Sequence, residues 1–287
     1  MSAALATAGR RILLALDAAR CDPVQLQLVA DLAAHLRAEV DALFIEDDDL
    51  LRTAELAFLR EINLRTATTA PIEAGALRRT LRALAADAQR ALAQTVGRAR
   101  VSWRFRVVRG RKRAAVAAAA GDIDLLVALT AARPLARPQC VAAAALEAAA
   151  RAGRPLLLLR PGVEPLGPVV VTLAETPLSE RALGFCAELA ERIQRPLVIQ
   201  ALGADAARAR RLLAAAEARA ARQRLEVRGR AEDLGATPRI TAIGRIQALA
   251  AELPGALWCL PADLPLLTAP RPPCLEDLVD GAILLVR

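Results

Sequence analysis

The 287-residue sequence contains no tyrosine, and two tryptophans and four phenylalanines are its only aromatic residues. Such a chain offers few flat side chains on which single-stranded bases could stack. It also has one histidine, His35, so Ser-His-Asp or Cys-His chemistry would have to recruit that residue from a helix far in sequence from Ser179 or any cysteine. The motifs GxSxG and GxGxxG and the P-loop do not occur. We therefore expect no enzymatic activity.

The five cysteines are scattered, without a CxxC pair or a histidine cluster. Structural zinc needs four converging sulfur or nitrogen ligands, and a disulfide framework is not typical of a chain this long with an odd cysteine count. We therefore expect no metal site and predict that the cysteines are small residues of the hydrophobic core. They are Cys21, Cys140, Cys186, Cys259 and Cys274.

Long apolar runs are missing too, although 55% of the residues are hydrophobic, because alanine supplies much of that fraction. We find no run of about 18 strongly apolar residues. The opening MSAALATAGRR has no apolar core before its arginines, unlike a secretory signal. These features predict a cytoplasmic protein without membrane insertion.

Positive charge prevails, with a formal net charge of +8, which can indicate nucleic-acid binding. Nearly every cation is arginine, however, with Lys112 the sole lysine, and alanine and leucine are abundant throughout. That composition is typical of a GC-rich genome rather than of a particular ligand. We expect no nucleic-acid partner and keep a basic nucleic-acid-associated protein as a third hypothesis.

Short apolar runs alternate with helical patterns through the first half of the chain. RILLALD at 11–17 suits a strand buried on both faces, and Asp22-Pro23 gives the next helix a cap and a first-turn proline. The order βαβααβαβαβ predicts an α/β fold with a doubly wound parallel sheet. The expected strands are 11–17, 40–45, 101–108, 123–129 and 155–159; the expected helices are 26–36, 51–62, 74–96, 114–120 and 141–151, with a loop at 66–71.

RPGVEPLGP at 160–168 suits neither helix nor sheet, so we place a domain boundary there. One domain is expected over 1–162 and a second over 163–287. The second half repeats the cap and proline as Thr176-Pro177. Its expected strands are 168–173, 197–201, 225–227, 256–260 and 282–286, and its expected helices are 178–192, 204–222 and 243–253.

The two halves match in detail, as the products of a duplication would. The end of the first strand and the start of the second are 24 positions apart in each half, from Leu16 to Val40 and from Leu173 to Leu197. IDLLVAL in the first half corresponds to GALWCL in the second, and PLLLLR corresponds to AILLVR. We therefore predict two tandem domains of one fold.

These segments resemble the universal stress protein family. SERALGFCAELAERI at 179–193 is similar to the first helix of that family, and the strand-end Asp17, VVRG at 107–110 and IDLLVALT at 123–130 are similar to its later motifs. The closing strand occurs in both halves. The resemblance covers nearly the whole chain and implies a Rossmann-like fold, although the first half carries an extra helical segment around 47–65.

The resemblance implies a nucleotide site in ATP-binding members, where the strand-one aspartate meets the adenine and a Gly-x-x-Gly loop with a Gly-Ser pair wraps the phosphates. Glycine is needed because backbone N–H groups converge on phosphate only where no side chain intervenes. Here the first half reads Leu129-Thr130-Ala131-Ala132 and the second reads Leu260-Pro261-Ala262-Asp263. Both first-glycine positions are leucine in this alignment.

The second half departs further from that pattern. Pro261 has no N–H to donate, Asp263 would repel phosphate, and Ala174 stands where the adenine-side aspartate would be. We predict no ATP binding in the second half, whereas the first half keeps Asp17 and Gly110 and could still bind a nucleotide.

A basic run, Arg109 to Arg113, lies where the third strand turns into a helix. Cations oppose the positive end of a helix dipole, so a bound anion would explain them. Alternatively, the arginines extend into solvent or pair with the acidic stretch 46–49. That stretch could suggest a divalent metal, but carboxylates belong in the first turn of a helix. The candidate nucleotide or anion ligands are Asp17, Arg109, Gly110, Arg111 and Thr130.

We interpret the chain as a non-enzymatic, universal-stress-protein-like module for stress response or regulation. It would act through protein contacts without ATP or another cofactor. The halves are expected to pack as an intramolecular pseudo-dimer, and a homodimer is compatible with the pattern. The alternative is a stress protein that binds a nucleotide or anion in the first domain only.

Overall fold

A computed structural model describes most of the chain. The described residues are 10–17, 22–56, 60–63, 67–71, 73–130, 140–162, 167–223, 225–270, 273–279 and 281–287. The strands are β1 (Arg10–Leu16), β2 (Ala38–Asp47), β3 (Arg60–Asn63), β4 (Thr68–Pro71), β5 (Trp103–Gly110), β6 (Leu125–Leu129), β7 (Leu156–Leu159), β8 (Val169–Leu173), β9 (Leu197–Gly203), β10 (Val227–Asp233), β11 (Leu257–Pro261) and β12 (Ala282–Val286).

The helices are α1 (Pro23–Leu36), α2 (Asp48–Ala54), α3 (Ala74–Ala99), α4 (Lys112–Ala119), α5 (Val141–Ala152), α6 (Pro177–Ile193), α7 (Ala206–Ala220), α8 (Pro238–Glu252), α9 (Pro265–Thr268) and α10 (Leu275–Leu278). Among the described residues, none of these helices combines the length and the apolar character that crossing a membrane requires.

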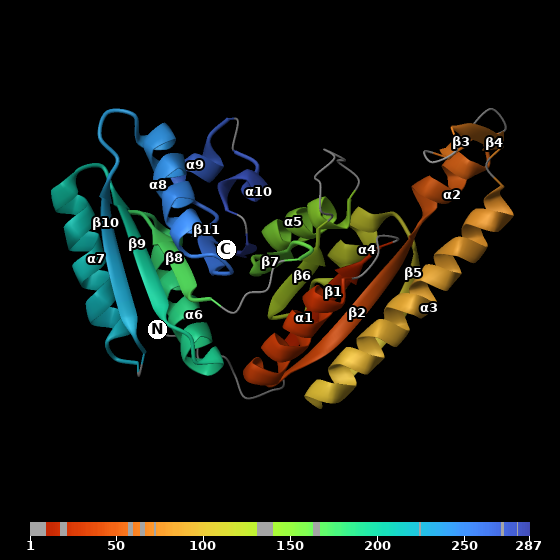
Figure 1. The fold of residues 1–287 in the computed structure, drawn as a ribbon, viewed down its shortest axis with the longest axis horizontal. Coiled ribbons are helices and arrows are strands. Elements are labelled where there is room, and N and C mark those ends of the chain that lie inside the picture. The colour runs from red at the N-terminus through yellow and green to blue at the C-terminus, as the bar shows by residue number, and fades with distance from the viewer. Residues whose placement is uncertain are drawn as a thin grey trace.

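Ten strands form one sheet in the order β10-β9-β8-β11-β12-β7-β6-β1-β2-β5 (Figure 1). Each half contributes five parallel strands, and counted along its own chain each half has the order 3-2-1-4-5. The last strands of the halves, β7 and β12, pair antiparallel at the centre, with Leu157 opposite Leu284. The predicted α/β class and doubly wound topology are confirmed.

The first two strands pair in the same register in both halves. Ile12 lies opposite Val40 in the first half, and Val169 lies opposite Leu197 in the second. This register agrees with the 24-residue spacing seen in the sequence. The expected boundary adjoins 163–166, which lie outside the described residues, so the division into domains 1–162 and 163–287 stays a prediction.

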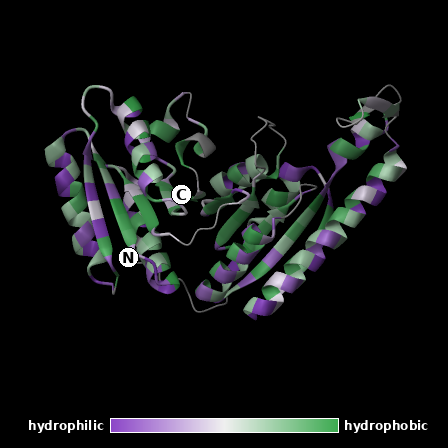
Figure 2. Ribbon diagram, viewed as in Figure 1, coloured by the Kyte–Doolittle hydropathy of each residue, from purple (hydrophilic) through white to green (hydrophobic). Residues whose placement is uncertain are grey.

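Helices cover both faces of the sheet, and the strand residues alternate between two cores. Along β1, Ile12, Leu14 and Leu16 join the core under α1, α3, α6 and α7, whereas Leu13 and Ala15 join the core under α4, α5, α8, α9 and α10. Figure 2 shows the apolar colour concentrated on the strands and mixed colouring on the outer helices. The strands are therefore buried on both faces, as the continuous apolar runs predicted.

Asp22 caps α1 as the sequence indicated. One carboxylate oxygen accepts the N–H of Val24 at 3.0 Å, and the other accepts the N–H of Gly162 at 2.9 Å. The cap therefore also fixes the segment that leaves β7. Thr176, the corresponding residue before α6, makes no side-chain cap of its own.

The predicted helix over 51–62 is confirmed only at its beginning and is wrong at its end. α2 ends at Ala54, and Ile62 lies in β3, which pairs antiparallel with β4 where a loop was expected. Phe58, which the helical pattern included, lies outside the described residues. The helical spacing misled because Ile62 faces solvent, with 63% of its surface exposed, rather than packing on a core. Figure 1 shows α2 and this hairpin at the outer end of α3.

Two other expectations need correction. The weak strand expected at 225–227 is β10, which begins at Val227 and runs to Asp233, because its alternating charged residues suit an exposed edge strand. Cys186 and Cys259 are core residues as predicted, but Cys140 and Cys274 are exposed. The two exposed cysteines are the N-cap residues of α5 and α10. They lie just before the helix and not on its buried face. Cys21 lies outside the described residues.

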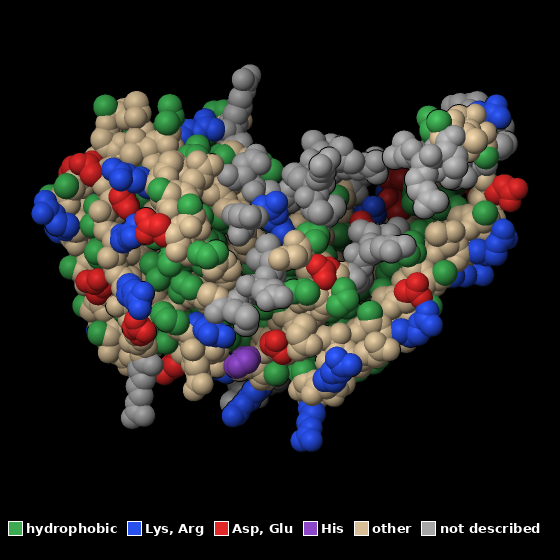
Figure 3. Space-filling model, in the orientation of Figure 1, with side chains coloured by type: hydrophobic (Ala, Val, Ile, Leu, Met, Phe, Trp, Pro, Cys, Tyr) green, Lys and Arg blue, Asp and Glu red, His purple; other side chains and the backbone are tan. Residues whose placement is uncertain are grey.

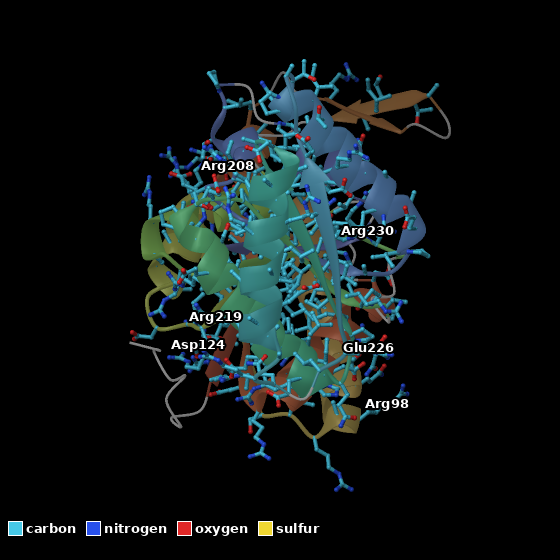
Figure 4. All side chains as sticks on the ribbon, turned by 90° about the vertical axis from the view of Figure 1, so that its left-hand side faces the viewer. Arg98, Asp124, Arg208, Arg219, Glu226 and Arg230 are labelled. Atoms are coloured by element: carbon cyan, nitrogen blue, oxygen red, sulfur yellow. The ribbon has the colours of Figure 1, made fainter. Side chains whose placement is uncertain are left out.

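The edge formed by β10 and α7 carries arginines, and Figure 4 looks directly onto it. Nη1 of Arg230 lies 3.0 Å from Oε1 of Glu252, and Nη2 of Arg228 lies 2.7 Å from Oε1 of Glu226. Charged side chains along an outer strand oppose pairing with a strand of another chain.

The other outer strand, β5, directs arginines to one buried carboxylate. The side chain of Asp41 is 2% exposed and lies 2.7 Å from Arg104 and 2.8 Å from Arg106. Arg11 approaches the same oxygen at 3.6 Å. The guanidinium groups stay between a third and a half exposed, so the cluster connects the three strands β1, β2 and β5 while its cations remain hydrated.

Candidate functional site

The carboxyl ends of β6, β1, β2 and β5 lie along one edge of the first half because these strands are parallel. Ligands of open α/β sheets bind at this edge. Asp17 follows β1, Thr130 follows β6, Arg109 and Gly110 close β5, and Arg111 comes next. The structure thus brings all five candidate residues of the first half to the ends of neighbouring strands.

Lys112, the first residue of α4, connects two of these strand ends. Its Nζ lies 3.5 Å from Oδ2 of Asp17 and 3.1 Å from Oδ2 of Asp47. The three side chains are only 12–18% exposed, so solvent screens their charges less than those of a surface pair. The carboxylate that the resemblance assigns to an adenine therefore already contacts a cation of the chain.

The two arginines beside Gly110 pair with the acidic stretch after β2. Nε of Arg109 lies 2.7 Å from Oδ1 of Asp48, and Nε of Arg111 lies 3.4 Å from Oδ1 of Asp49. The hydrogen bond with Asp48, together with its charge, raises the pKa of Arg109 above its ordinary value. Of the two explanations that the sequence left open, the structure shows pairing with the acidic stretch. These cations require no bound anion.

Thr130 and Gly110 leave few donors for a phosphate. The N–H of Thr130 donates to the carbonyl of Leu159 at 2.8 Å, and its hydroxyl approaches the same oxygen at 3.3 Å. Gly110 pairs with Asp47 in the ladder, and a Cβ there would meet no atom within 4 Å. Ala131 and Ala132, which follow Thr130 in the expected loop, lie outside the described residues.

Asp263 closes the same edge in the second half. Its Oδ1 accepts the hydroxyl of Thr176 at 2.8 Å, and its Oδ2 accepts the N–H of Leu178 at 2.9 Å. Leu178 is the second residue of the 17-residue helix α6. A helix N-terminus attracts anions, so the chain's own carboxylate occupies the place where a ligand anion would bind.

Ser179 completes this network. Its hydroxyl lies 3.0 Å from that of Thr176 and accepts the N–H of Ala174 at 3.1 Å. Ala174 follows β8 as Asp17 follows β1, so alanine stands at the position that corresponds to Asp17. The loop between β8 and α6 is therefore satisfied by its own side chains.

The register of the sheet corrects one correspondence drawn from the sequence. Leu125 lies opposite Ile12, and Leu257 lies opposite Val169, so the counterpart of Leu129 is Pro261 rather than Leu260. The next residues, Thr130 and Ala262, correspond in the same way. Each donates its N–H to the carbonyl of the last residue of the closing strand of its half, β7 at 2.8 Å and β12 at 2.9 Å. The first-glycine position of the second half thus has no N–H at all.

Sequence reasoning missed the roles of Lys112, Thr176 and Ser179. Lys112 was part of the basic run but was not singled out, although a lone lysine among arginines was a visible signal. The bond between Thr176 and Asp263 joins residues 87 positions apart, and no local pattern reports it. Within the described ranges, no three His, Cys, Asp or Glu side chains are placed to hold a metal ion.

Charged side chains of both signs are interspersed over the left half of the face in Figure 3. On the described part of the first-half edge, the basic run likewise alternates with its acidic partners. Arg113, the last of that run, lies 3.2 Å from Glu147 of α5.

No protein-family model matches the sequence, and no curated protein matches it. Solved structures do match over nearly the whole chain. A universal stress protein from Archaeoglobus fulgidus DSM 4304 has a TM-score of 0.61 at 12% identity, covering 96% of each chain. A Pseudomonas aeruginosa UCBPP-PA14 protein assigned to that family has a TM-score of 0.57 at 13% identity, covering 97% of this chain and 93% of the other.

A third match is the cytoplasmic domain of a prokaryotic cation chloride cotransporter, with a TM-score of 0.54 at 10% identity, covering 96% of this chain and 95% of the other. Identities this low establish the fold alone. The chain has the fold of the universal stress proteins that its sequence resembles.

Proposed function

We propose that this protein is a cytoplasmic stress-response or regulatory module that acts through protein contacts and does not bind ATP. One observation carries the proposal: side chains of the chain itself occupy the carboxyl edges of both halves. Lys112 contacts Asp17 in the first half, and Asp263 caps α6 in the second.

ATP binding in the second half would have to displace Asp263. That displacement breaks one hydrogen bond to a hydroxyl and one to a backbone N–H, each charge-assisted and contributing about 1.5–3 kcal/mol. It would also bring a triphosphate beside a carboxylate, which raises the cost further. Pro261 supplies no N–H in return.

ATP binding in the first half meets a smaller obstacle. An adenine at Asp17 competes with Lys112, and a phosphate near Arg109 or Arg111 competes with Asp48 and Asp49. The alternative function, nucleotide or anion binding by the first domain alone, therefore requires a rearrangement of three ion pairs.

One comparison supports action through contacts. A domain of the same fold forms the cytoplasmic part of a cation chloride cotransporter. That protein links this fold to a larger assembly, and we propose a partner-dependent role for the present chain by analogy.

The test is a thermal-shift titration of the full chain with ATP, ADP, cyclic nucleotides and inorganic phosphate. We expect no ligand to raise the melting temperature. A rise that disappears in Arg111→Ala but persists in the exposed control Arg222→Ala would favour the alternative. A rise that persists in both variants would overturn the absence of nucleotide binding without supporting that site. Crosslinking and pull-down from stressed cells would then identify the protein partner.

A further inference from the structure

A groove of about 420 Å³ lies where the two halves meet, on the face that carries α1 and α6. Its position follows from the topology. In the described residues no helix lies between β7 and β8, and β7 and β12 pair at the centre of the sheet. Among the described residues, α1 and α6 flank the centre of the sheet on this face.

The walls and floor of this seam groove are mostly apolar. α1 contributes three residues one turn apart, which place a continuous apolar stripe along one wall. Leu157 of β7 and Leu257 of β11 form the floor and are 2% and 8% exposed. The remaining apolar lining residues are Val24, Leu28, Leu32 and Ile193. Clefts of this size and character are the usual sites of small ligands.

The polar rim on α1 is internally satisfied. The amide of Gln27 donates to Oδ1 of Asp31 at 2.8 Å, and the ring of His35 contacts the carbonyl of Asp31 at 2.6 Å. These contacts hold the rim side chains of α1 in place relative to one another.

Arg195 lies on the opposite rim and is different. Its backbone is fixed after α6, because its N–H donates to the carbonyl of Ala190 at 3.0 Å. Its side chain is exposed, and the described residues supply it with no ion-pair partner. The groove thus combines an apolar channel with the exposed cation of Arg195 on one rim and with Asp31 and His35 on the other.

Two backbone segments approach each other closely at Gly167, at one end of the groove. The N–H of Gly167 donates to the carbonyl of Gly255 at 3.1 Å. A Cβ on Gly167 would lie 3.0 Å from backbone atoms of Gly255 and Ala256. A side chain at this position would therefore require the neighbouring backbone to shift slightly.

We propose that the seam groove binds a small molecule with an extended apolar body and one anionic group, such as a medium-chain carboxylate. The apolar body lies along the α1 stripe over Leu157 and Leu257, where its burial is favourable. The anionic group pairs with Arg195 through a charge-assisted hydrogen bond. This site is separate from both carboxyl edges and does not depend on the function proposed above.

Such a ligand contacts both halves at once. Val24, Leu28 and Leu32 belong to the first half, whereas Ile193 and Arg195 belong to the second. Because a ligand that binds only the folded chain raises its stability by mass action, occupancy would strengthen the contact between the halves.

The experiment is a calorimetric titration of the full chain with decanoate, kept below the concentration at which it aggregates, and with decanol as the neutral analogue. We expect saturable decanoate binding. Leu28→Trp, which fills the groove, should abolish it, and Arg195→Gln should weaken it about tenfold while leaving decanol binding unchanged. The matched controls are Ile240→Trp, at an exposed site on α8, and Arg222→Gln.

Circular dichroism shows whether each variant is folded. If Leu28→Trp does not fold, Arg195→Gln still tests the site. Absence of saturable decanoate binding to the wild-type chain overturns the proposal. So does binding that survives both substitutions in folded protein, or binding that the two control variants weaken equally.

Discussion

The hydroxyl of Thr176 donates to the carboxylate of Asp263 across 2.8 Å, joining the ends of two adjacent strands, β8 and β11. The same carboxylate also accepts the N–H of Leu178. Asp263, which follows β11, thereby caps α6, the helix that follows β8. This arrangement explains why Thr176 does not cap α6 directly and why an external anion finds the helix N-terminus occupied.

Removing this carboxylate should destabilise the fold. We expect Asp263→Ala to lower the free energy of unfolding by about 1–2 kcal/mol, the usual effect of losing a helix cap. In a double-mutant cycle with Thr176→Val, the coupling energy should be about 0.5–1.5 kcal/mol, measured by urea denaturation. Asp87→Ala, on the solvent face of α3, should change stability by less than about 0.5 kcal/mol. A coupling energy near zero would contradict the observed bond.

Lys112 should stabilise the first half because its ammonium group pairs with two carboxylates, those of Asp17 and Asp47. Lys112→Met leaves Asp17 and Asp47 without their shared cation, and we expect a loss of about 1–2 kcal/mol, between the values for exposed and buried ion pairs. Adding Asp17→Asn should recover part of that loss, because one of the two negative charges is removed. Chemical denaturation of the three proteins measures both effects. If Asp17→Asn made the Lys112→Met variant less stable still, the bridge would not be holding the two strand ends.

Two glycines at strand ends should respond oppositely to alanine. A Cβ on Gly203 would lie 2.7 Å from Cα of Ala209 and would also clash with its backbone nitrogen. We expect Gly203→Ala to cost about 1–3 kcal/mol or more through overpacking.

Gly110→Ala is the matched control, because a Cβ there meets no atom within 4 Å. It should be neutral or slightly stabilising, since alanine loses less backbone entropy than glycine on folding. Thermal unfolding of both variants tests the pair. Equal losses would show that contacts at these strand ends differ from those described.

The exposed and buried cysteines among the described residues should differ in their rate of alkylation. Complete burial, with a contribution from neighbouring Cys259, raises the pKa of Cys186 well above its ordinary value. A raised pKa leaves less thiolate at any given pH, and the thiolate is the reactive form. At mildly alkaline pH, iodoacetamide should therefore modify the exposed Cys140 and Cys274 and spare Cys186 and Cys259.

Peptide mapping by mass spectrometry distinguishes these sites, and urea should make the buried pair reactive. Rapid modification of Cys186 in the native protein would contradict its place on the buried face of α6.

The sequence predicted the fold where burial is regular. β1, with every residue from Ile12 to Leu16 buried, and the shared strand spacing in the two halves follow from apolar runs and turn signals. The hairpin at β3 and β4 was missed because Ile62 is exposed there, so periodicity reported neither a core face nor the pairing with β4.

The site was only partly predictable for a related reason. Asp17, Arg109 and Thr130 could be placed at strand ends, since strand order follows from the pattern. Pairing of Arg109 with the acidic stretch was one alternative that the sequence left open. The partners of Asp17 and Thr130 could not be predicted, because pairing at the sheet edge depends on register. One residue of register moved the correspondence of Leu129 from Leu260 to Pro261.

Direct measurement of ATP binding to the full chain tests most sharply whether both strand edges are closed to nucleotide. In isothermal titration or equilibrium dialysis with magnesium present, we expect no saturable binding of ATP. Saturable uptake of one or two ATP per chain, abolished by Asp17→Asn or enhanced by Asp263→Gly, would show that the self-paired edges open for nucleotide and would contradict the proposed function.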